Sequence, residues 1–209
     1  MRLLRVEKQI KDIVANKMIG TDINITMGTL RSINVYVMGE AFQPGLYTVS
    51  SLSTLTNAIF ASGGINTSGS LRNIQLKRDG EVISEFDFYD ILLNGDISKD
   101  LRLQPMDVIF IPPAEKTVGI RGEVFRPGIY ELKKQEVLSD LLKFSGNLKP
   151  KASGSIEITR IDKGKNGFNL IEVTNQDMQS GSLDLLSGDV VNIPLITNSL
   201  SIIFFIFKK

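Results

Sequence analysis

The sequence contains no histidine, no cysteine and no tryptophan among its 209 residues. Without histidine and cysteine, Ser-His-Asp and Cys-His catalysis, thiol redox chemistry and His/Cys zinc sites are excluded from this chain. The formal net charge is +1, from 24 basic and 23 acidic residues. This balance argues against the broad basic surface of a nucleic-acid-binding protein. The composition therefore favours a protein that is not an enzyme and that needs no metal, cofactor or nucleic acid.

Long hydrophobic runs are also missing. The basic first twenty residues contain no apolar run of seven or more, so they lack the pattern of a secretory signal. Near the other end, residues 202–207 are apolar, far short of the roughly 20 residues needed to span a bilayer. Val6, Ile10 and Ile13 recur at helical spacing, so residues 1–32 are expected to form a helix and a linker. We expect this helix to pack against the module that follows it rather than on a membrane surface.

An internal repeat organises most of the chain. The motif Gly-Glu-x-Phe-x-Pro-Gly-x-Tyr occupies residues 39–47 and returns 83 positions later at residues 122–130. At an offset of 82 positions, Arg78 aligns with Arg160 and Asp107 aligns with Asp189. A fixed period of this length indicates a repeated structural unit. The sequence therefore predicts two copies of one module, at residues 33–114 and 115–195.

Each copy is expected to open with a β-hairpin. Apolar and polar residues alternate over residues 33–38, which predicts a half-buried strand. Pro44-Gly45 and Pro127-Gly128 are typical of a type II turn, in which the glycine adopts a positive φ. A second strand should follow each of these pairs.

A short amphipathic helix is expected after the hairpin. Ser53 is its predicted N-cap, and Gly63-Gly64 is its predicted left-handed stop. In the second copy Asn147 replaces Gly64 and tolerates the same conformation. The predicted buried face of the first helix carries Leu55, Ala58 and Ile59.

The remaining segments of each copy indicate further strands. Asp79-Gly80 is a strong hairpin signal, and residues 163–167 occupy a similar place in the second copy. Short apolar strands that end in proline follow at residues 107–112 and 189–194. A hairpin, one helix and a small mixed sheet form a β-grasp arrangement, so the predicted fold class is α+β with two tandem modules.

These motifs together resemble the soluble-ligand-binding β-grasp (SLBB) domain. The tandem arrangement is similar to that of bacterial outer-membrane polysaccharide export proteins, with further similar segments at residues 28–35, 69–74 and 87–95. The resemblance implies a non-enzymatic periplasmic component of capsular or exopolysaccharide export, associated with the outer membrane. It also implies three kinds of partner: the polysaccharide, further copies of the chain in an oligomeric conduit wall or gate, and an inner-membrane polysaccharide copolymerase.

The chain departs from that family at both ends. Members normally carry a secretion signal and a preceding export domain, for which this sequence shows no pattern. Leu200 and Ile202 align with the opening strand of each module, but Phe204-Phe205 stand where Gly-Glu is expected. Residues 196–209 are therefore interpreted as a tail that begins a third module, and the chain as a fragment or frameshifted product of a longer exporter.

Two other classes of function remain open. A β-grasp module in another pathway could bind a small ligand or a protein partner through a sheet face or edge. A polysaccharide hydrolase or lyase would need two carboxylates about 5 to 9.5 Å apart in a cleft, and the sequence nominates no such pair. Asp87, Asp90, Asp96 and Asp100 have carboxylate spacing but lack the calcium-loop pattern, so they are expected to form a solvated face.

The candidate site residues fall into two groups. The candidate ligand contacts are basic residues beside predicted strands, namely Arg72, Lys77, Arg78 and Arg160. The repeated motif residues are assigned structural roles in the turns and hairpins. They are Gly39, Glu40, Pro44, Gly45 and Tyr47 in the first copy and Gly122, Glu123, Pro127, Gly128 and Tyr130 in the second.

Overall fold

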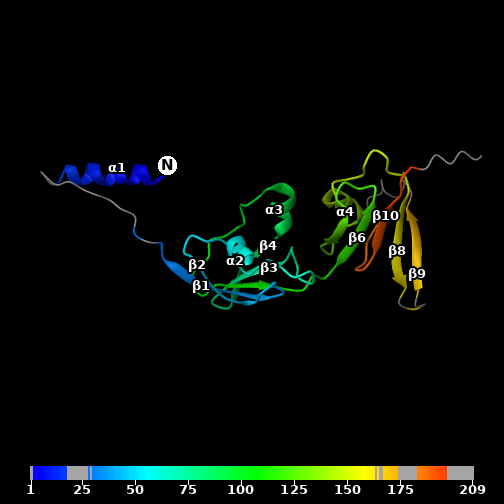
Figure 1. Cartoon of the computed structure of the whole chain (residues 1–209), viewed down its shortest axis with the longest axis horizontal. Coiled ribbons are helices and arrows are strands. Elements are labelled where there is room, and N and C mark those ends of the chain that lie inside the picture. Colours follow the sequence, from blue (N-terminus) through cyan, green and yellow to red (C-terminus); the bar gives the residue numbers. More distant parts are fainter. Residues whose placement is uncertain are drawn as a thin grey trace, which may run out of the picture. The chain divides into compact units, whose positions relative to one another are not determined.

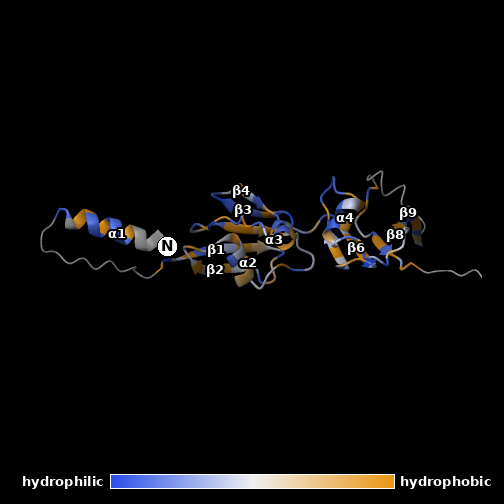
Figure 2. Cartoon of the chain, turned by 90° about the horizontal axis from the view of Figure 1, so that it is seen from above, coloured by the Kyte–Doolittle hydropathy of each residue, from blue (hydrophilic) through white to orange (hydrophobic). Residues whose placement is uncertain are grey.

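The computed structural model describes residues 2–17, 28, 30–162, 164, 167–173 and 183–196. The chain divides into two compact units, Met1–Ser32 and Ile33–Lys209. In the first unit the structure describes helix α1 (Arg2–Ala15). Hydrophobic and hydrophilic residues alternate along this helix (Figure 2). Its packing against the first module stays a prediction. Of the tail at residues 196–209 that is expected to begin a third module, residues 197–209 lie outside the described residues.

The second unit contains two five-stranded sheets of the same topology (Figure 1). The first module has strand order β2-β1-β5-β3-β4, in which β1 and β5 are parallel and β3 is antiparallel to both β5 and β4. The second module repeats this as β7-β6-β10-β8-β9. Both modules also carry a helix, so the predicted α+β class with two tandem β-grasp modules is confirmed.

The elements of the first module are β1 (Ser32–Gly39), β2 (Gly45–Ser50), α2 (Leu55–Ala61), β3 (Ile74–Arg78), β4 (Glu81–Phe86), α3 (Phe88–Asn94) and β5 (Val108–Ile111). Those of the second are β6 (Thr117–Gly122), β7 (Gly128–Glu131), α4 (Leu138–Phe144), β8 (Ile156–Asp162), β9 (Gly167–Val173) and β10 (Val190–Ile193).

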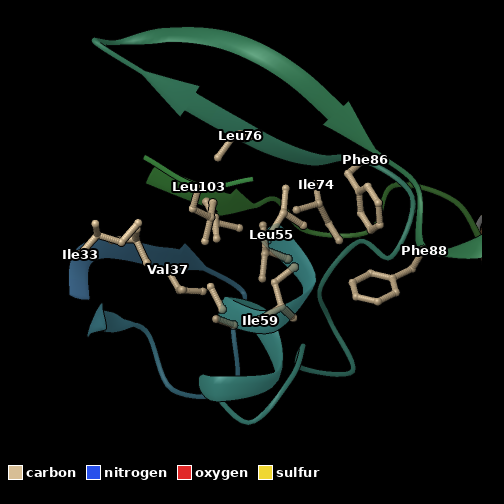
Figure 3. Close-up of a cluster of buried hydrophobic side chains, with 14 residues drawn as sticks. Ile33, Val37, Leu55, Ile59, Ile74, Leu76, Phe86, Phe88 and Leu103 are labelled. Atoms are coloured by element: carbon tan, nitrogen blue, oxygen red, sulfur yellow. The ribbon is translucent and has the colours of Figure 1, made fainter. Parts of the chain in front are cut away.

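Helix α2 packs its predicted apolar face onto one side of the first sheet. Leu55 and Ile59 point from the helix toward Val37 and Ile74 of the strands (Figure 3). All four side chains are at most 1% exposed. Full burial of such a side chain contributes about 1.5 to 3 kcal/mol, so this contact between helix and sheet is a main source of the module's stability. In the second module Leu138 and Leu141 of α4 bury the equivalent face.

The N-cap of α2 is Thr54 rather than the predicted Ser53. The carbonyl of Ser53 accepts the amide N–H of Leu103 at 3.0 Å, and Thr54 forms a bridge with Arg102. These contacts hold the chain extended for one residue more than the sequence suggests. The amide N–H of Thr54 then donates to Asn57 Oδ1 at 3.0 Å, which satisfies a free donor at the start of the helix. The predicted left-handed stops are confirmed, with φ of +85° and +100° at Gly63 and Gly64 and +70° at Asn147.

The glycines at positive φ in the opening hairpins are not those that the Pro-Gly pairs predict. Gly45 and Gly128 begin strands β2 and β7 without a positive φ, so the type II turn prediction is wrong. The left-handed residues are instead Gly39 and Gly122, with φ of +80° and +89°. A Cβ atom on Gly39 would lie 2.1 Å from the carbonyl oxygen of Ile111 on the parallel strand. The close approach of the two chains therefore requires glycine at the end of β1.

The hairpin between β3 and β4 forms as predicted. Asp79 and Gly80 have φ of +51° and +87°. Two successive left-handed residues match the twist of the flanking strands, which is why Asp-Gly favours this two-residue turn.

Candidate functional site

Two of the four basic candidates are engaged within their own modules. The guanidinium of Arg78 donates to both carboxylate oxygens of Asp107, at 2.8 and 2.9 Å, and Arg160 pairs with Asp189 in the same way in the second module. Both aspartates are at most 1% exposed. Asp107 also accepts the amide N–H of Gln104 at 2.7 Å. The hydrogen bond to Asp107 raises the pKa of Arg78 further above its ordinary range. These pairs join the turn before the last strand of each module to the neighbouring strand.

The third candidate, Lys77, has a different environment. Its Nζ lies 4.7 Å from the ring centre of Phe110, on the neighbouring strand β5. Within the described residues, no carboxylate forms an ion pair with Lys77. The ligand-binding roles of Lys77, Arg78 and Arg160 stay predictions.

The fourth candidate, Arg72, lies where the two modules meet. Its Nη2 atom is 3.2 Å from Asp87 Oδ2 in the first module and 2.9 Å from Glu136 Oε1 in the second. Its Nη1 atom donates to the backbone carbonyl of Glu131 at 3.2 Å and also to Glu136. Lys133 of the second module reaches back to Asp87 at 2.8 Å. Since Arg72 is only 8% exposed, this is a buried ion network that crosses the contact.

Aromatic rings enclose the guanidinium of Arg72. Its central carbon lies 4.5 Å from the ring centre of Tyr89 and 4.9 Å from that of Phe144, which belongs to the second module. A cation over an aromatic face is stabilised by the ring's electron density, and more strongly where water is excluded. The Tyr89 hydroxyl also accepts the amide N–H of Glu131 at 3.0 Å. The Glu131 carboxylate in turn accepts hydrogen bonds from the Ser70 hydroxyl and the Leu71 amide, at 2.6 and 2.7 Å.

The charge state of Asp87 reports on this contact. Burial alone would raise the pKa of Asp87, but hydrogen bonds from Lys133 and Arg72 outweigh it and lower the pKa below the ordinary value of 3.8. Because the pKa is lower in the folded state than in the unfolded state, the stabilisation is present above pH 3.8 and disappears as the pH falls through the lowered value.

We therefore expect the Asp87 carboxyl to titrate below pH 3.8 when followed by carboxyl-carbon NMR. In Lys133→Met the midpoint should move upward, because the hydrogen bond from Lys133, the largest of the contacts that lower the Asp87 pKa, is gone. Lys143→Met removes a lysine that pairs with Asp140 instead, and should leave the Asp87 midpoint in place. An unchanged midpoint in Lys133→Met would show that the contact with Asp87 does not persist in solution.

A cleft of about 580 Å³ opens beside this network. Groups of both charges line it, including Lys99, Lys116, Glu85 and Glu115. Such a lining can hold polar ligands by hydrogen bonds and ion pairs. For acid catalysis a carboxyl group needs a raised pKa, but every carboxyl with a shifted pKa in the described residues, namely Asp87, Asp96 and Asp140, is shifted downward.

The four aspartates whose carboxylate spacing was noted, at positions 87, 90, 96 and 100, are dispersed among separate contacts. Asp87 belongs to the inter-module network, and Asp90 pairs with Lys99 at 2.9 Å. Asp96 accepts the amide N–H of Ser98 at 2.8 Å, and Asp100 accepts the amide and the hydroxyl of Thr56. Within the described ranges, no group of three or more acidic residues could hold a metal ion.

The repeated motif residues hold the opening hairpins. The hydroxyls of Tyr47 and Tyr130 donate to carbonyls four residues earlier in their own hairpins, those of Gln43 and Arg126, at 2.6 and 2.8 Å. The backbone amides of Glu40 and Glu123 donate to the last residue of the parallel strand, at 2.8 and 2.9 Å. Pro44 and Pro127 directly precede strands β2 and β7. The motif therefore builds the end of each sheet.

Sequence reasoning placed Arg72 correctly beside a strand but missed its partners Asp87, Tyr89 and Glu136. The sequence did contain one signal, because the residue types at these positions differ between the two copies. At an offset of 83 residues, Glu136 corresponds to Ser53. The counterpart of Arg72 is Gly154 at an offset of 82 or Ser155 at an offset of 83, and neither is basic. Residues that differ between two copies of one fold are free of the shared packing requirements, and here they form the contact between the copies.

The fold and the repeated motif define a tandem β-grasp protein. SLBB domains match residues 34–111 and residues 117–169, so this chain contains two tandem SLBB domains. Two relatives, both described as polysialic acid transport protein KpsD from Escherichia coli, are each 29% identical over 120 residues. The alignment covers 56% of this chain and 21% of each relative, so the chain matches about a fifth of their length. Among the described residues, none of the helices has the length and apolar character of a membrane span.

Proposed function

We propose that this chain acts as a non-enzymatic component of capsular polysaccharide or exopolysaccharide export in the bacterial periplasm. The observation that carries the proposal is the pair of SLBB domains in a chain related to a polysialic acid transport protein. The proposed partners are the polysaccharide, further copies of the chain and an inner-membrane polysaccharide copolymerase. The two modules would form part of an oligomeric conduit wall or gate associated with the outer membrane.

The contact between the modules supports this role. A conduit wall must keep its modules in a fixed relation while polymer passes, and the Arg72 network holds them together by buried ion pairs and aromatic contacts. Hydrogen bonds to hydroxyl groups contribute about 0.5 to 1.5 kcal/mol each, so a dispersed polar surface is enough for a sliding polymer.

A second candidate function is the binding of a small ligand or a protein partner in another pathway. The inter-module cleft favours it, because about 580 Å³ lies within the size range of small-molecule sites. Its charged lining counts against it, since such sites are mostly apolar.

Disruption of the coding sequence in the bacterium that encodes this chain tests the export proposal. We expect loss of polysaccharide from the cell surface, while polymer is still synthesised and accumulates inside the cell. Surface polymer should return with the wild-type gene and with Gly45→Ala, whose added Cβ would come no closer than 3.9 Å to a neighbouring atom. A normal amount of surface polymer in the disrupted strain would exclude the export role and favour the second candidate.

A further inference from the structure

Among the four basic candidates, Lys77 alone has a side-chain charge without a carboxylate partner within the described residues. Arg72, Arg78 and Arg160 are each paired with carboxylates. The charges of these three guanidinium groups are therefore already compensated within the protein. Lys77 is therefore the candidate whose charge is available to a ligand.

Lys77 belongs to the outer face of the first sheet, opposite to the face that α2 covers. Strand alternation places Val37, Leu76 and Ile109 in the core, and their chain neighbours point the other way. The register aligns Tyr36 with Val108, Met38 with Phe110, and Phe110 with Gln75. The centre of this face consists of Tyr36, Met38, Gln75, Lys77, Val108 and Phe110, all half-buried. It is an apolar and aromatic strip with an ammonium group above it. Glu85 of β4 pairs with Gln75, so this exposed glutamate lies on the same face at the edge of the strip.

The second module shows that the fold does not require this strip. At the equivalent register positions it has Gly119 and Arg121 on β6 and Asn192 on β10. Asn192 donates from Nδ2 to Glu157 Oε2 at 2.8 Å, across to β8. The exposed apolar residues of that sheet lie away from its centre, at Ile129 on β7 and at Ile161, Phe168 and Leu170 on the β8–β9 hairpin. The second sheet folds with other residues at these central positions, so folding alone does not require the apolar strip of the first module. A role in binding can account for it.

We propose that the outer face of the first sheet binds an acidic saccharide chain. The proposal rests on the function proposed above and names the module surface and the chemistry of the polymer. The rings of Tyr36 and Phe110 and the thioether of Met38 would contact the C–H faces of the sugar rings. The ammonium of Lys77 would meet a sugar carboxylate, and the amide of Gln75 can hydrogen-bond hydroxyl groups. A sheet face suits an extended chain, whereas compact ligands bind in concave sites.

Titration of the full chain with sialic acid oligomers and oligogalacturonate, followed by amide NMR, tests this. Maltohexaose is the neutral comparison. We expect shifts in β1, β3 and β5 with both acidic probes, and weaker binding at higher salt because the ion pair is exposed. Lys77→Gln should weaken the acidic probes by about two- to fivefold and leave maltohexaose unchanged. Phe110→Asn, which installs the residue of the second module, should weaken all three probes by about two- to tenfold.

The control variant is Lys134→Gln, because the Lys134 side chain is 88% exposed in the second module. It should bind every probe as the wild type does.

Shifts confined to the inter-module cleft, or no shifts with either acidic probe, would contradict the proposed site. Neither result would affect the export proposal, which is tested by the disrupted strain. Shifts on the outer face that grow with protein concentration in the absence of sugar would show that this face binds a second copy of the chain. That result would also contradict the proposed saccharide site.

Discussion

Gly39→Ala is expected to unfold the first module or to lower its free energy of unfolding by about 3 kcal/mol or more. Two physical effects combine, backbone strain and a steric clash. A side chain at a φ of +80° is strained, and the new Cβ atom would lie 2.1 Å from the carbonyl oxygen of Ile111. Backbone atoms of the parallel strand cannot move aside without breaking the β1–β5 pairing. Urea denaturation monitored by circular dichroism measures the loss.

Gly45→Ala is the matched control within the same motif. Gly45 has no positive φ, and its added Cβ would come no closer than 3.9 Å, to the ring of Tyr47. Its stability should therefore stay close to that of the wild type. If Gly45→Ala were instead the less stable of the two variants, the result would support the type II turn that the Pro-Gly pair predicts and would contradict the hairpin described above. Gly122→Ala should repeat the effect in the second module, because its Cβ would lie 2.1 Å from the carbonyl of Ile193.

Arg72→Met is expected to lower the free energy of unfolding by about 3 kcal/mol, because it leaves Glu136 without its cation and Asp87 with Lys133 alone. Asp87 and Glu136, whose side chains are 10% and 16% exposed, would face each other across the contact between the modules. The modules should also lose their fixed relation. Denaturation measures the stability, and residual dipolar couplings of the two sheets should change from one common alignment to two.

Two further variants separate the ion network from simple packing. Lys134→Met removes a cation from the rim, where the nearest carboxylate oxygen is 4.0 Å away, and should change the stability by no more than about 1 kcal/mol. Arg72→Met combined with Asp87→Asn and Glu136→Gln should recover much of the loss, because the unpaired charges are gone. A single common alignment and wild-type stability in Arg72→Met alone would show that other contacts hold the modules together.

The repeat allowed much of each module to be predicted. The alternation at residues 33–38, the helical spacing of Leu55, Ala58 and Ile59, and the Asp79-Gly80 turn all correspond to the observed elements. These features depend on neighbours a few residues apart, so their physical causes lie in the local sequence. The N-cap was displaced by one residue because the carbonyl of Ser53 bonds to Leu103, which is far away in the sequence.

The candidate site was less predictable for the same reason. A basic residue beside a strand can be identified from sequence, but whether its charge is paired depends on what the fold brings to it. Arg78 and Arg160 meet buried aspartates 29 residues further along, and Arg72 meets Glu136 from the other module. Lys77 differs from them only through this environment, in which Phe110 lies beneath its ammonium group.

From the order of the amino acids alone it follows that histidine and cysteine chemistry are absent, that one module occurs twice, and which faces of its helices and strands are apolar. Local periodicity and turn chemistry carry that information. The tertiary structure was needed to show that Gly39 rather than Gly45 is the constrained glycine, that Arg72 joins the modules, and that Lys77 has no carboxylate partner among the described residues. Those outcomes arise from the approach of strands and side chains distant in sequence, whose distances no local pattern contains.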